Sequence, residues 1–391
     1  MIMEFCTLTK LFHNPLVSAL ALLCIATTSL NPATASKRCD FPAIFNFGAS
    51  NADTGGLAAS FPFAQPKSPN GDTFFHRPAG RFCDGRLIID FMAQSFGLPF
   101  LSPYLDSMGS NFSRGANFAS AGSTIRLQQA AGQFRTSPFS LGLQYQQFER
   151  FKPNAKFIRG QGGVFAALMP KKEYFDEALY TFDIGQNDLT VGFLGNMTLQ
   201  QVNASVPDIV SNFTSNIKNI YNLGARSFWI HNTGPIGCLP LILTNFESAE
   251  RDMYGCAKAY NEVANSFNQN LKKALAHLRK DLPTAAITYV DIYSVKYSLF
   301  RDPKKYGFEL PHVACCGYGG KYNFSNSVSC GGTTKVNDND IFVGSCERPS
   351  VRVIWDGIHY TEAANKVVYD QISSGAFTDP PIPLNMACRR K

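Results

Sequence analysis

Three features are missing from the 391-residue sequence, and each absence excludes a class of protein. After residue 35 no stretch is apolar for long enough to cross a bilayer, which argues against stable insertion in a membrane. No run of Lys and Arg is interleaved with aromatic residues, so the net charge of +7 does not indicate a nucleic-acid-binding protein. No internal repeat or linker is visible, which favours a single folded domain.

The sequence also has no C-x-x-C pair, which argues against a structural zinc site, and we expect no bound metal or cofactor. Eleven cysteines are present, and Cys6 and Cys24 fall in the first 35 residues. In an oxidising compartment most of the other nine should form disulfides, and the odd number leaves one over. Spacing does not fix their pairing. These nine are Cys39, Cys83, Cys238, Cys256, Cys315, Cys316, Cys330, Cys346 and Cys388.

The first 35 residues have the pattern of a secretory signal peptide. Lys10 lies in a short polar start, residues 16–30 are apolar, and residues 33–35 (Ala-Thr-Ala) have the small-x-small pattern of a cleavage site. The alternative, a membrane anchor, is disfavoured because the apolar stretch is too short to span comfortably. We therefore predict a removed segment at 1–35 and one domain at 36–391.

What the sequence does contain is typical of a globular protein, with 45% hydrophobic and 17% charged residues. If the chain enters a secretory pathway, its N-x-S/T sequons predict a glycoprotein. Five sequons are present, and they begin at Asn111, Asn196, Asn203, Asn212 and Asn323.

Short apolar runs alternate with amphipathic stretches along the chain. Because this alternation is typical of βαβ units, we predict a three-layer α/β/α sandwich with a central, mostly parallel sheet. The strands are expected at residues 41–47, 115–119, 178–184, 226–232 and 286–291. The helices are expected at residues 86–96, 206–223, 253–278 and 361–372, the last with Thr361 as its N-cap. Residues 57–85 indicate irregular structure.

Ser50 follows the first of these strands, where parallel sheets carry their functional loops. A serine hydroxyl needs a base that is itself held by an acceptor. His359 has the carboxylate of Asp356 three residues before it, with a turn between them, and this spacing can orient one imidazole nitrogen toward a serine. The motif is common by chance, and a surface turn before a helix explains it about equally well.

Four blocks together resemble the GDSL (SGNH) esterase and lipase family, and residues 41–56 (FPAIFNFGASNADTGG) resemble its plant secreted branch. The other blocks are residues 117–122, 184–188 and 355–359. The resemblance implies that Ser50, Asp356 and His359 form a catalytic triad. It also implies that the N–H of Ser50, the N–H of Gly122 and the amide of Asn187 form the oxyanion hole. Ordinary turns are the alternative for Gly122 and Asn187.

One residue departs from the family pattern. Ala49 stands where the family has Asp before the serine, and we interpret it as a tolerated variation in loop support rather than a lost activity, with Asp53 a candidate substitute for the loop hydrogen bonds. No G-x-S-x-G surrounds Ser50, which argues against the nucleophile elbow of the α/β-hydrolases. Asp188 is expected to hold its loop. His231 could line the cleft, but a histidine in an apolar strand is more often structural.

The sequence thus predicts a secreted serine esterase or lipase that hydrolyses carboxylic esters through an acyl-enzyme on Ser50. Two alternatives remain open: an acyltransferase that passes the acyl group to an alcohol, and a catalytically silent binding or defence glycoprotein. Small-molecule, lipid or carbohydrate esters are the expected substrates, with weak association with acidic wall polymers a minor possibility. The expected location is extracellular or the cell wall, with the vacuole as an alternative.

Overall fold

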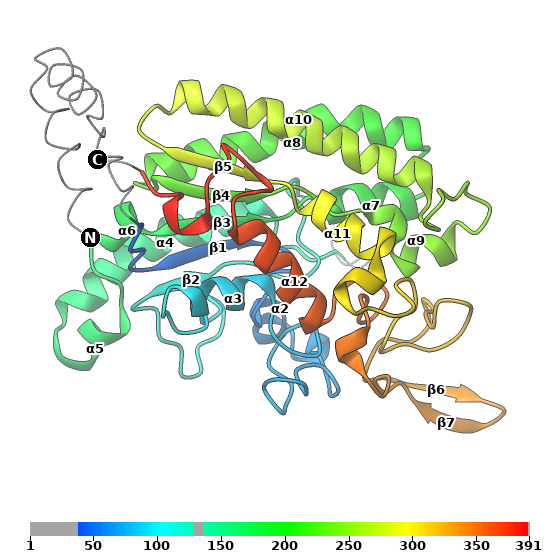
Figure 1. The fold of residues 1–391 in the computed structure, drawn as a ribbon. Helices are drawn as coiled ribbons and strands as arrows, with labels where there is room; N and C mark the ends of the chain where they lie inside the picture. The colour runs from blue at the N-terminus through cyan, green and yellow to red at the C-terminus, as the bar shows by residue number, and fades with distance from the viewer. Residues whose placement is uncertain (1–37, 128–135, 390–391) are drawn as a thin grey trace, which may run out of the picture. The chain divides into compact units, whose positions relative to one another are not determined.

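The computed structural model describes residues 38–127 and 136–389, so the predicted signal peptide lies outside the described residues. A six-stranded sheet forms the centre, with the strand order β2-β1-β3-β4-β5-β8 (Figure 1). The first five strands are parallel and β8 is antiparallel to β5, as the predicted mostly parallel sheet requires. The strands span Ile44–Gly48 (β1), Gly115–Asn117 (β2), Leu179–Asp183 (β3), Ser227–His231 (β4), Ala286–Val290 (β5) and Thr378–Asp379 (β8).

The strands are apolar because both faces of the sheet are covered. In β1 every residue is buried, and successive side chains join different cores: Ile44 packs in one cluster while Phe45 and Phe47 pack in the other. A parallel sheet buried on both faces favours such continuous apolar runs. The five predicted strands are therefore confirmed, each within a few residues of its expected bounds.

Helices cover the two faces of the sheet. One core includes residues of α4, α8 and α10, and Figure 1 shows α8 and α10 running side by side. The other core includes residues of α3, α11 and α12. This arrangement confirms the predicted α/β/α architecture. These helices span Ile88–Ser95 (α3), Leu141–Gly160 (α4), Leu199–Asn222 (α8), Lys258–Asp281 (α10), Ile292–Arg301 (α11) and Glu362–Ser373 (α12).

The first residues of three helices differ from or match their predicted positions according to the hydrogen bonds made just before them. The helix expected from residue 206 begins earlier, at Leu199, because Thr198 Oγ1 accepts the N–H of Gln201 in a capping box. The helix expected from residue 253 begins later, because Asp252 Oδ1 accepts two N–H groups in a turn before it. Thr361 caps α12 as predicted.

Shorter elements fill the connections. The stretch 57–85 is mostly irregular, as predicted, but it includes one short helix and one 3-10 turn. The short α-helices are Gly56–Ser60 (α2), Gly163–Leu168 (α5), Tyr174–Glu177 (α6), Gln186–Leu194 (α7) and Pro240–Asn245 (α9). The 3-10 turns are Pro62–Ala64, Ile236–Cys238, Pro303–Tyr306, Pro349–Val351 and Leu384–Met386. A separate hairpin consists of Thr333–Val336 (β6) and Asn339–Phe342 (β7).

Four disulfides confirm the expectation that most cysteines pair. Cys83 is free and buried, which accounts for the odd one. One bridge joins the two ends of the described chain across 349 residues, and two others hold the segment that carries the hairpin. The pairs are Cys39–Cys388, Cys238–Cys256, Cys315–Cys346 and Cys316–Cys330.

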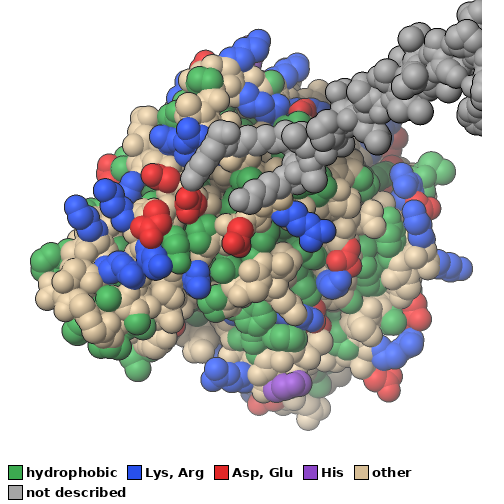
Figure 2. All heavy atoms as spheres, turned by 60° about the vertical axis from the view of Figure 1, so that its left-hand side comes forward, with side chains coloured by type: hydrophobic (Ala, Val, Ile, Leu, Met, Phe, Trp, Pro, Cys, Tyr) green, Lys and Arg blue, Asp and Glu red, His purple; other side chains and the backbone are tan. Residues whose placement is uncertain are grey.

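Charge is distributed without a dominant patch on the face drawn in Figure 2. Lys and Arg side chains are scattered there and lie among Asp and Glu. No helix of residues 38–127 and 136–389 is long and apolar enough to cross a membrane.

Candidate active site

The carboxyl ends of β1 and β3 bring the first candidate residues together. Gly48 lies opposite Asp183 in the parallel register, and the Asp183 carbonyl accepts the N–H of Ala49 at 3.0 Å. Ser50 follows directly, is 7% exposed, and lies in a turn closed by the N–H of Ala52 on the Ala49 carbonyl. The N–H of Ser50 donates to no group among the described residues.

Glycine is required at position 48 because the backbone of Asp183 approaches it too closely for a side chain. A Cβ at this position would lie 2.5 Å from the Asp183 carbonyl oxygen. The fully buried Gln144 of α4 fixes the same residue from the other side: its Oε1 accepts the Gly48 N–H, and its Nε2 donates to the Gly48 carbonyl, both at 2.9 Å. Nε2 also donates to Ser123 Oγ at 3.0 Å, so one side chain ties the serine loop to the Gly122 loop.

Asp53 performs the loop function expected of it. Its buried carboxylate accepts the N–H groups of Gly55, Gly56 and Leu57, and the N–H of Ala121 at 2.7 Å. Burial raises the pKa of Asp53, and these hydrogen bonds oppose that rise. The carboxylate therefore joins the Ser50 loop to the Gly122 loop, although Ala49 itself is a buried apolar residue.

The Gly122 and Asn187 loops meet through a second carboxylate. Asp188 accepts the N–H of Ile125 at 2.8 Å and that of Arg126 at 3.2 Å, so it holds its loop as predicted. Burial raises the pKa of Asp188 to about 6. Asn187 Nδ2 donates to the Ser123 carbonyl at 2.8 Å, which leaves its second N–H for another acceptor. The Gly122 N–H has no acceptor within the described parts of the chain.

Asp356 and His359 form a closed turn before α12. Asp356 Oδ2 lies 2.7 Å from His359 Nδ1, and Oδ1 accepts the N–H groups of Ile358 and His359. Burial alone would raise the pKa of Asp356, but the charge and hydrogen bonds of His359 lower it overall. His359 Nε2 is buried and contacts no hydrogen-bond partner in the described structure, not even Ser50 Oγ. The imidazole is therefore oriented by the carboxylate while its second nitrogen stays available.

Residues 80–82 link this turn to the serine loop. Gly80 packs so closely on Gly55 that a Cβ would lie 2.5 Å from the Gly55 Cα. Phe82, two residues later, lies with its ring centroid 5.5 Å from that of His359. The sequence did not single out Phe82 or Gln144, because both act through contacts distant in the chain.

A second carboxylate–imidazole pair lies at the ends of β3 and β4. Asp183 Oδ2 is 3.2 Å from His231 Nδ1, and His231 Nε2 is buried without a partner in the part of the chain that is described. Burial alone would raise the pKa of Asp183, but His231 and the charge of Lys296 lower it overall. Lys296 is 1% exposed, and its Nζ lies 4.3 Å from the ring centroid of Tyr360, the residue after His359.

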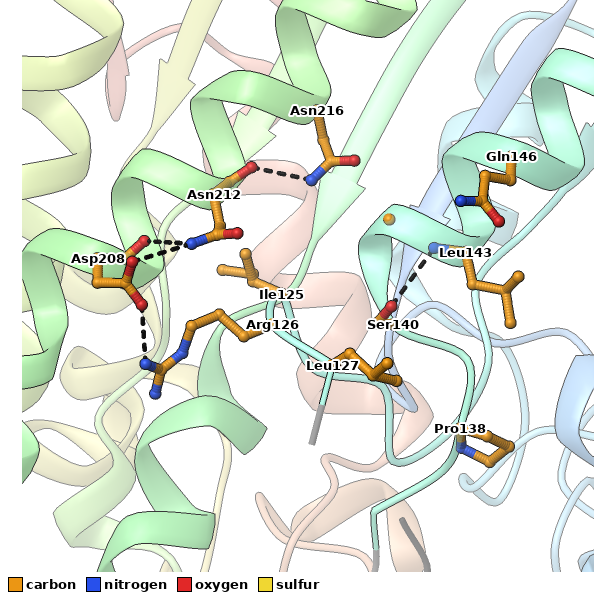
Figure 3. Close-up of a pocket in the computed structure, with 11 residues that line it drawn as sticks. Ile125, Arg126, Leu127, Pro138, Ser140, Leu143, Gln146, Asp208, Asn212 and Asn216 are labelled. Carbon is orange, nitrogen blue, oxygen red and sulfur yellow. Dashed lines mark hydrogen bonds and ion pairs between the residues drawn. The ribbon is translucent and has the colours of Figure 1, made fainter. Parts of the chain in front are cut away.

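Other candidate sites are less developed. Among residues 38–127 and 136–389, no group of three His, Cys, Asp or Glu side chains gathers as a metal site would require. Figure 3 shows a pocket between α4 and α8, with the Arg126–Asp208 ion pair on its α8 side. The volume of this pocket is about 560 Å³. None of the five predicted catalytic and oxyanion residues lines it.

Comparison with known proteins identifies the family. Residues 44–372 match the model of the GDSL-like lipase/acylhydrolase family. The chain is 63% identical to GDSL esterase/lipase ENOD8 of Medicago truncatula, with 97% of each chain covered. It is 62% identical to an esterase of Hevea brasiliensis, covering 97% of this chain and 96% of the other. It is also 50% identical to alpha-L-fucosidase 3 of Arabidopsis thaliana, and the match covers 97% of this chain and 100% of the other. The chain therefore belongs to the GDSL-like lipase/acylhydrolase family and is a carboxylic ester hydrolase.

Proposed function

We propose that Ser50 is the nucleophile of this hydrolase, with His359 as general base and Asp356 as the residue that orients it. The observation that carries the proposal is the Asp356–His359 hydrogen bond of 2.7 Å, combined with a His359 Nε2 that has no partner among the described residues. An imidazole held in this way at one nitrogen can accept a proton at the other.

The proposed reaction proceeds in two balanced steps. Ser50 Oγ bonds to the ester carbonyl carbon while its proton passes to His359 Nε2, and the imidazolium returns that proton to the leaving alcohol as its C–O bond breaks. Water then attacks the acyl-enzyme by the same route, which releases the acid and restores Ser50. The Ser50–His359 hydrogen bond absent from the described structure must form during this cycle, as often happens on substrate binding.

The N–H groups of Ser50 and Gly122 and the free N–H of Asn187 are the proposed oxyanion donors. Two observations support them: neither backbone N–H has an acceptor in the described chain, and Asp53, Gln144 and Asp188 hold the three loops together. Donors fixed before the reaction need no reorganisation as charge develops, and the loss of one typically costs about a hundred- to a thousandfold in rate.

The nucleophile is tested by fluorophosphonate labelling with peptide mapping, together with turnover of a short-chain aryl ester. The wild type should label at Ser50 and turn over, and Ser50→Ala should do neither. Ser374→Ala is the matched control, because that exposed serine hydroxyl bonds only to Gln371 and Ala376, which are close to it in the chain. Equal turnover by wild type and Ser50→Ala would contradict the proposal, whereas a wild type that neither labels nor turns over would favour the silent binding protein.

Two further assays separate the alternatives. If an added acceptor alcohol yields transfer product faster than free acid forms, the acyltransferase is the better description. An aryl α-L-fucoside tests the activity named for the Arabidopsis relative. We expect no cleavage, since glycosidases generally use a pair of carboxylates flanking the bond, whereas the proposed site offers one carboxylate committed to His359.

We also propose that residues 1–35 direct secretion, that residues 36–391 form the mature domain, and that the sequons are glycosylated. Four disulfides support an oxidising compartment. Asn111, Asn196, Asn203 and Asn212 are exposed. Asn323 is partly buried and its amide donates to the Ala314 carbonyl, so we expect it to be the least modified. Peptide mapping of secreted protein after glycosidase treatment tests each site.

Weak association with acidic wall polymers is tested by retention on pectin at low and high salt.

A further inference from the structure

Phe82 is the exception in an otherwise buried segment. Arg81, Cys83, Asp84 and Gly85 around it are all buried, whereas the Phe82 ring is only partly covered. Among the residues that the structure describes, its one ring contact is His359, at 5.5 Å between centroids and tilted by 34°. An apolar ring left partly open beside the proposed general base provides apolar surface that a ligand can cover.

The backbone on the N-terminal side of Phe82 is fixed through Arg81. The buried Arg81 guanidinium binds both oxygens of Asp90, at 2.6 and 2.8 Å, and also donates to the Ala79 carbonyl. Arg81 also lies over the ring of Phe75, 4.5 Å from its centroid. Such a bidentate pair restricts where the next residue can lie.

The backbone on the C-terminal side is tied to the segment that carries His359. Asp84 Oδ1 accepts the N–H of Glu362 at 2.7 Å, and Asp84 Oδ2 accepts the hydroxyl of Thr73. Cys83 accepts the N–H of Gly71 at its carbonyl. The backbone that carries Phe82 is therefore tied on both sides, and on one side directly to the segment that carries His359.

The chemistry of the proposed reaction assigns a role to this position. The general acid must reach the oxygen of the departing alcohol, so the alcohol part of the ester lies beside His359. The carbonyl oxygen points instead toward the oxyanion donors at Gly122 and Asn187. A ring against the imidazole thus contacts the alcohol part and not the acyl part.

We infer that Phe82 is a specificity-determining residue that selects esters with a planar, aromatic alcohol part by stacking on it. The inference rests on the proposed function of Ser50 and His359. Offset or tilted aromatic pairs add a modest free energy beyond area burial, which corresponds to roughly three- to tenfold in kcat/KM.

The test compares benzyl acetate with cyclohexylmethyl acetate, whose alcohols are similar in size and acidity but differ in flatness. The wild type should prefer the benzyl ester, and Phe82→Leu should lose about three- to tenfold of that preference. Phe82→Tyr should retain it. Methyl phenylacetate and methyl cyclohexylacetate, which place the ring on the acyl side, should show no change in their ratio.

Phe112→Leu is the matched control, because this partly buried ring packs on Phe151 before β2, at the opposite end of the strands. An unchanged benzyl preference in Phe82→Leu, with Ser50→Ala inactive, would overturn the inference and leave the proposed function intact. Full activity in Ser50→Ala would instead overturn the proposed function.

A second measurement needs no variant. Benzyl alcohol should inhibit the wild type at a concentration about three- to tenfold lower than cyclohexylmethanol does, the same factor as for the esters. Equal inhibition by the two alcohols would contradict stacking at Phe82 even if Phe82→Leu failed to fold.

Discussion

Two carboxylate–imidazole pairs lie near the carboxyl ends of the strands, and they differ in how each is built. Asp356 and His359 belong to one turn, and the carboxylate also binds two N–H groups of that turn. Asp183 and His231 come from neighbouring strands, with a longer separation of 3.2 Å against 2.7 Å. In both pairs Nε2 is buried and unpartnered within the described residues, so this feature alone does not distinguish them.

What differs is the charge nearby and the freedom of the backbone. The Asp183 pair lies at the ends of two central strands and interacts with the buried Lys296, which places a positive charge beside the carboxylate. The Asp356 pair lies on a loop beside the partly open Phe82. A pair on a rigid strand with its own buried counter-charge is better suited to stabilise the fold, whereas a pair on a supported loop can reach a substrate.

The largest expected effect distinguishes the two imidazoles. His359→Gln should lower kcat by about 10⁵-fold or more, because the serine then has no base. His231→Gln should change kcat by less than about tenfold, because that imidazole has no proposed part in proton transfer. Steady-state kinetics on an aryl ester measures both. Comparable losses of kcat in the two variants would contradict the assignment of different roles to the two imidazoles.

The second largest effect is expected from Asp356, the carboxylate proposed to orient His359. Asp356→Asn should lower kcat by about 10⁴-fold, because an amide can donate to Nδ1 and so favour the wrong tautomer. Thermal unfolding should show a folded protein, and fluorophosphonate labelling should be slowed to a similar degree. A loss below tenfold would mean that His359 does not depend on this carboxylate.

The other carboxylate should act on stability. Asp183→Asn should lower the free energy of unfolding by about 3 kcal/mol, because His231 loses its carboxylate partner and the buried Lys296 loses a nearby negative charge, while kcat changes less than tenfold. Urea unfolding measures the first quantity. Lys272→Met breaks the exposed Lys272–Asp379 pair and serves as the control, with an expected loss below about 1 kcal/mol. If both variants lose the same stability, Asp183 is not a buried counter-ion.

The smallest effect is a pH dependence shared by the pairs. Because the folded-state pKa of Asp183 and of Asp356 is lowered, each carboxylate stabilises the fold above the ordinary carboxyl pKa near 3.8, and this stabilisation is lost as pH falls through the folded-state value. The wild type should therefore lose more unfolding free energy than Asp183→Asn or Asp356→Asn between pH 5 and pH 3. Parallel losses in all three proteins would contradict the lowered pKa values.

The sequence predicted the elements whose burial leaves a clear pattern of apolar residues. The central strands were predicted because a sheet covered on both faces demands apolar runs such as residues 178–184. Helix α4 was missed because few of its residues are apolar, it contains Pro153, and its most consequential side chain is the polar Gln144. The β6–β7 hairpin was missed because none of its side chains is fully buried, so it needs no alternation of apolar and polar residues.

The residues of the candidate site also fall into two groups, those that the sequence could predict and those that it could not. Ser50, Asp356 and His359 could be proposed from strand ends and from a three-residue spacing, which are local features. The contacts of Gln144 with Gly48, of Phe82 with His359 and of Lys296 with Tyr360 join residues distant in the chain, and a single sequence carries no signal for them. The disulfide pairing was hidden for the same reason.

The Cys39–Cys388 bridge turns almost the whole domain into a covalent ring. Ser50 and His359 both lie inside that ring, although they come from opposite ends of the polypeptide. A protease that cuts a surface loop once between them therefore opens the ring without releasing either of these two proposed catalytic residues. The nicked protein would remain one molecule until a reductant releases the bridge.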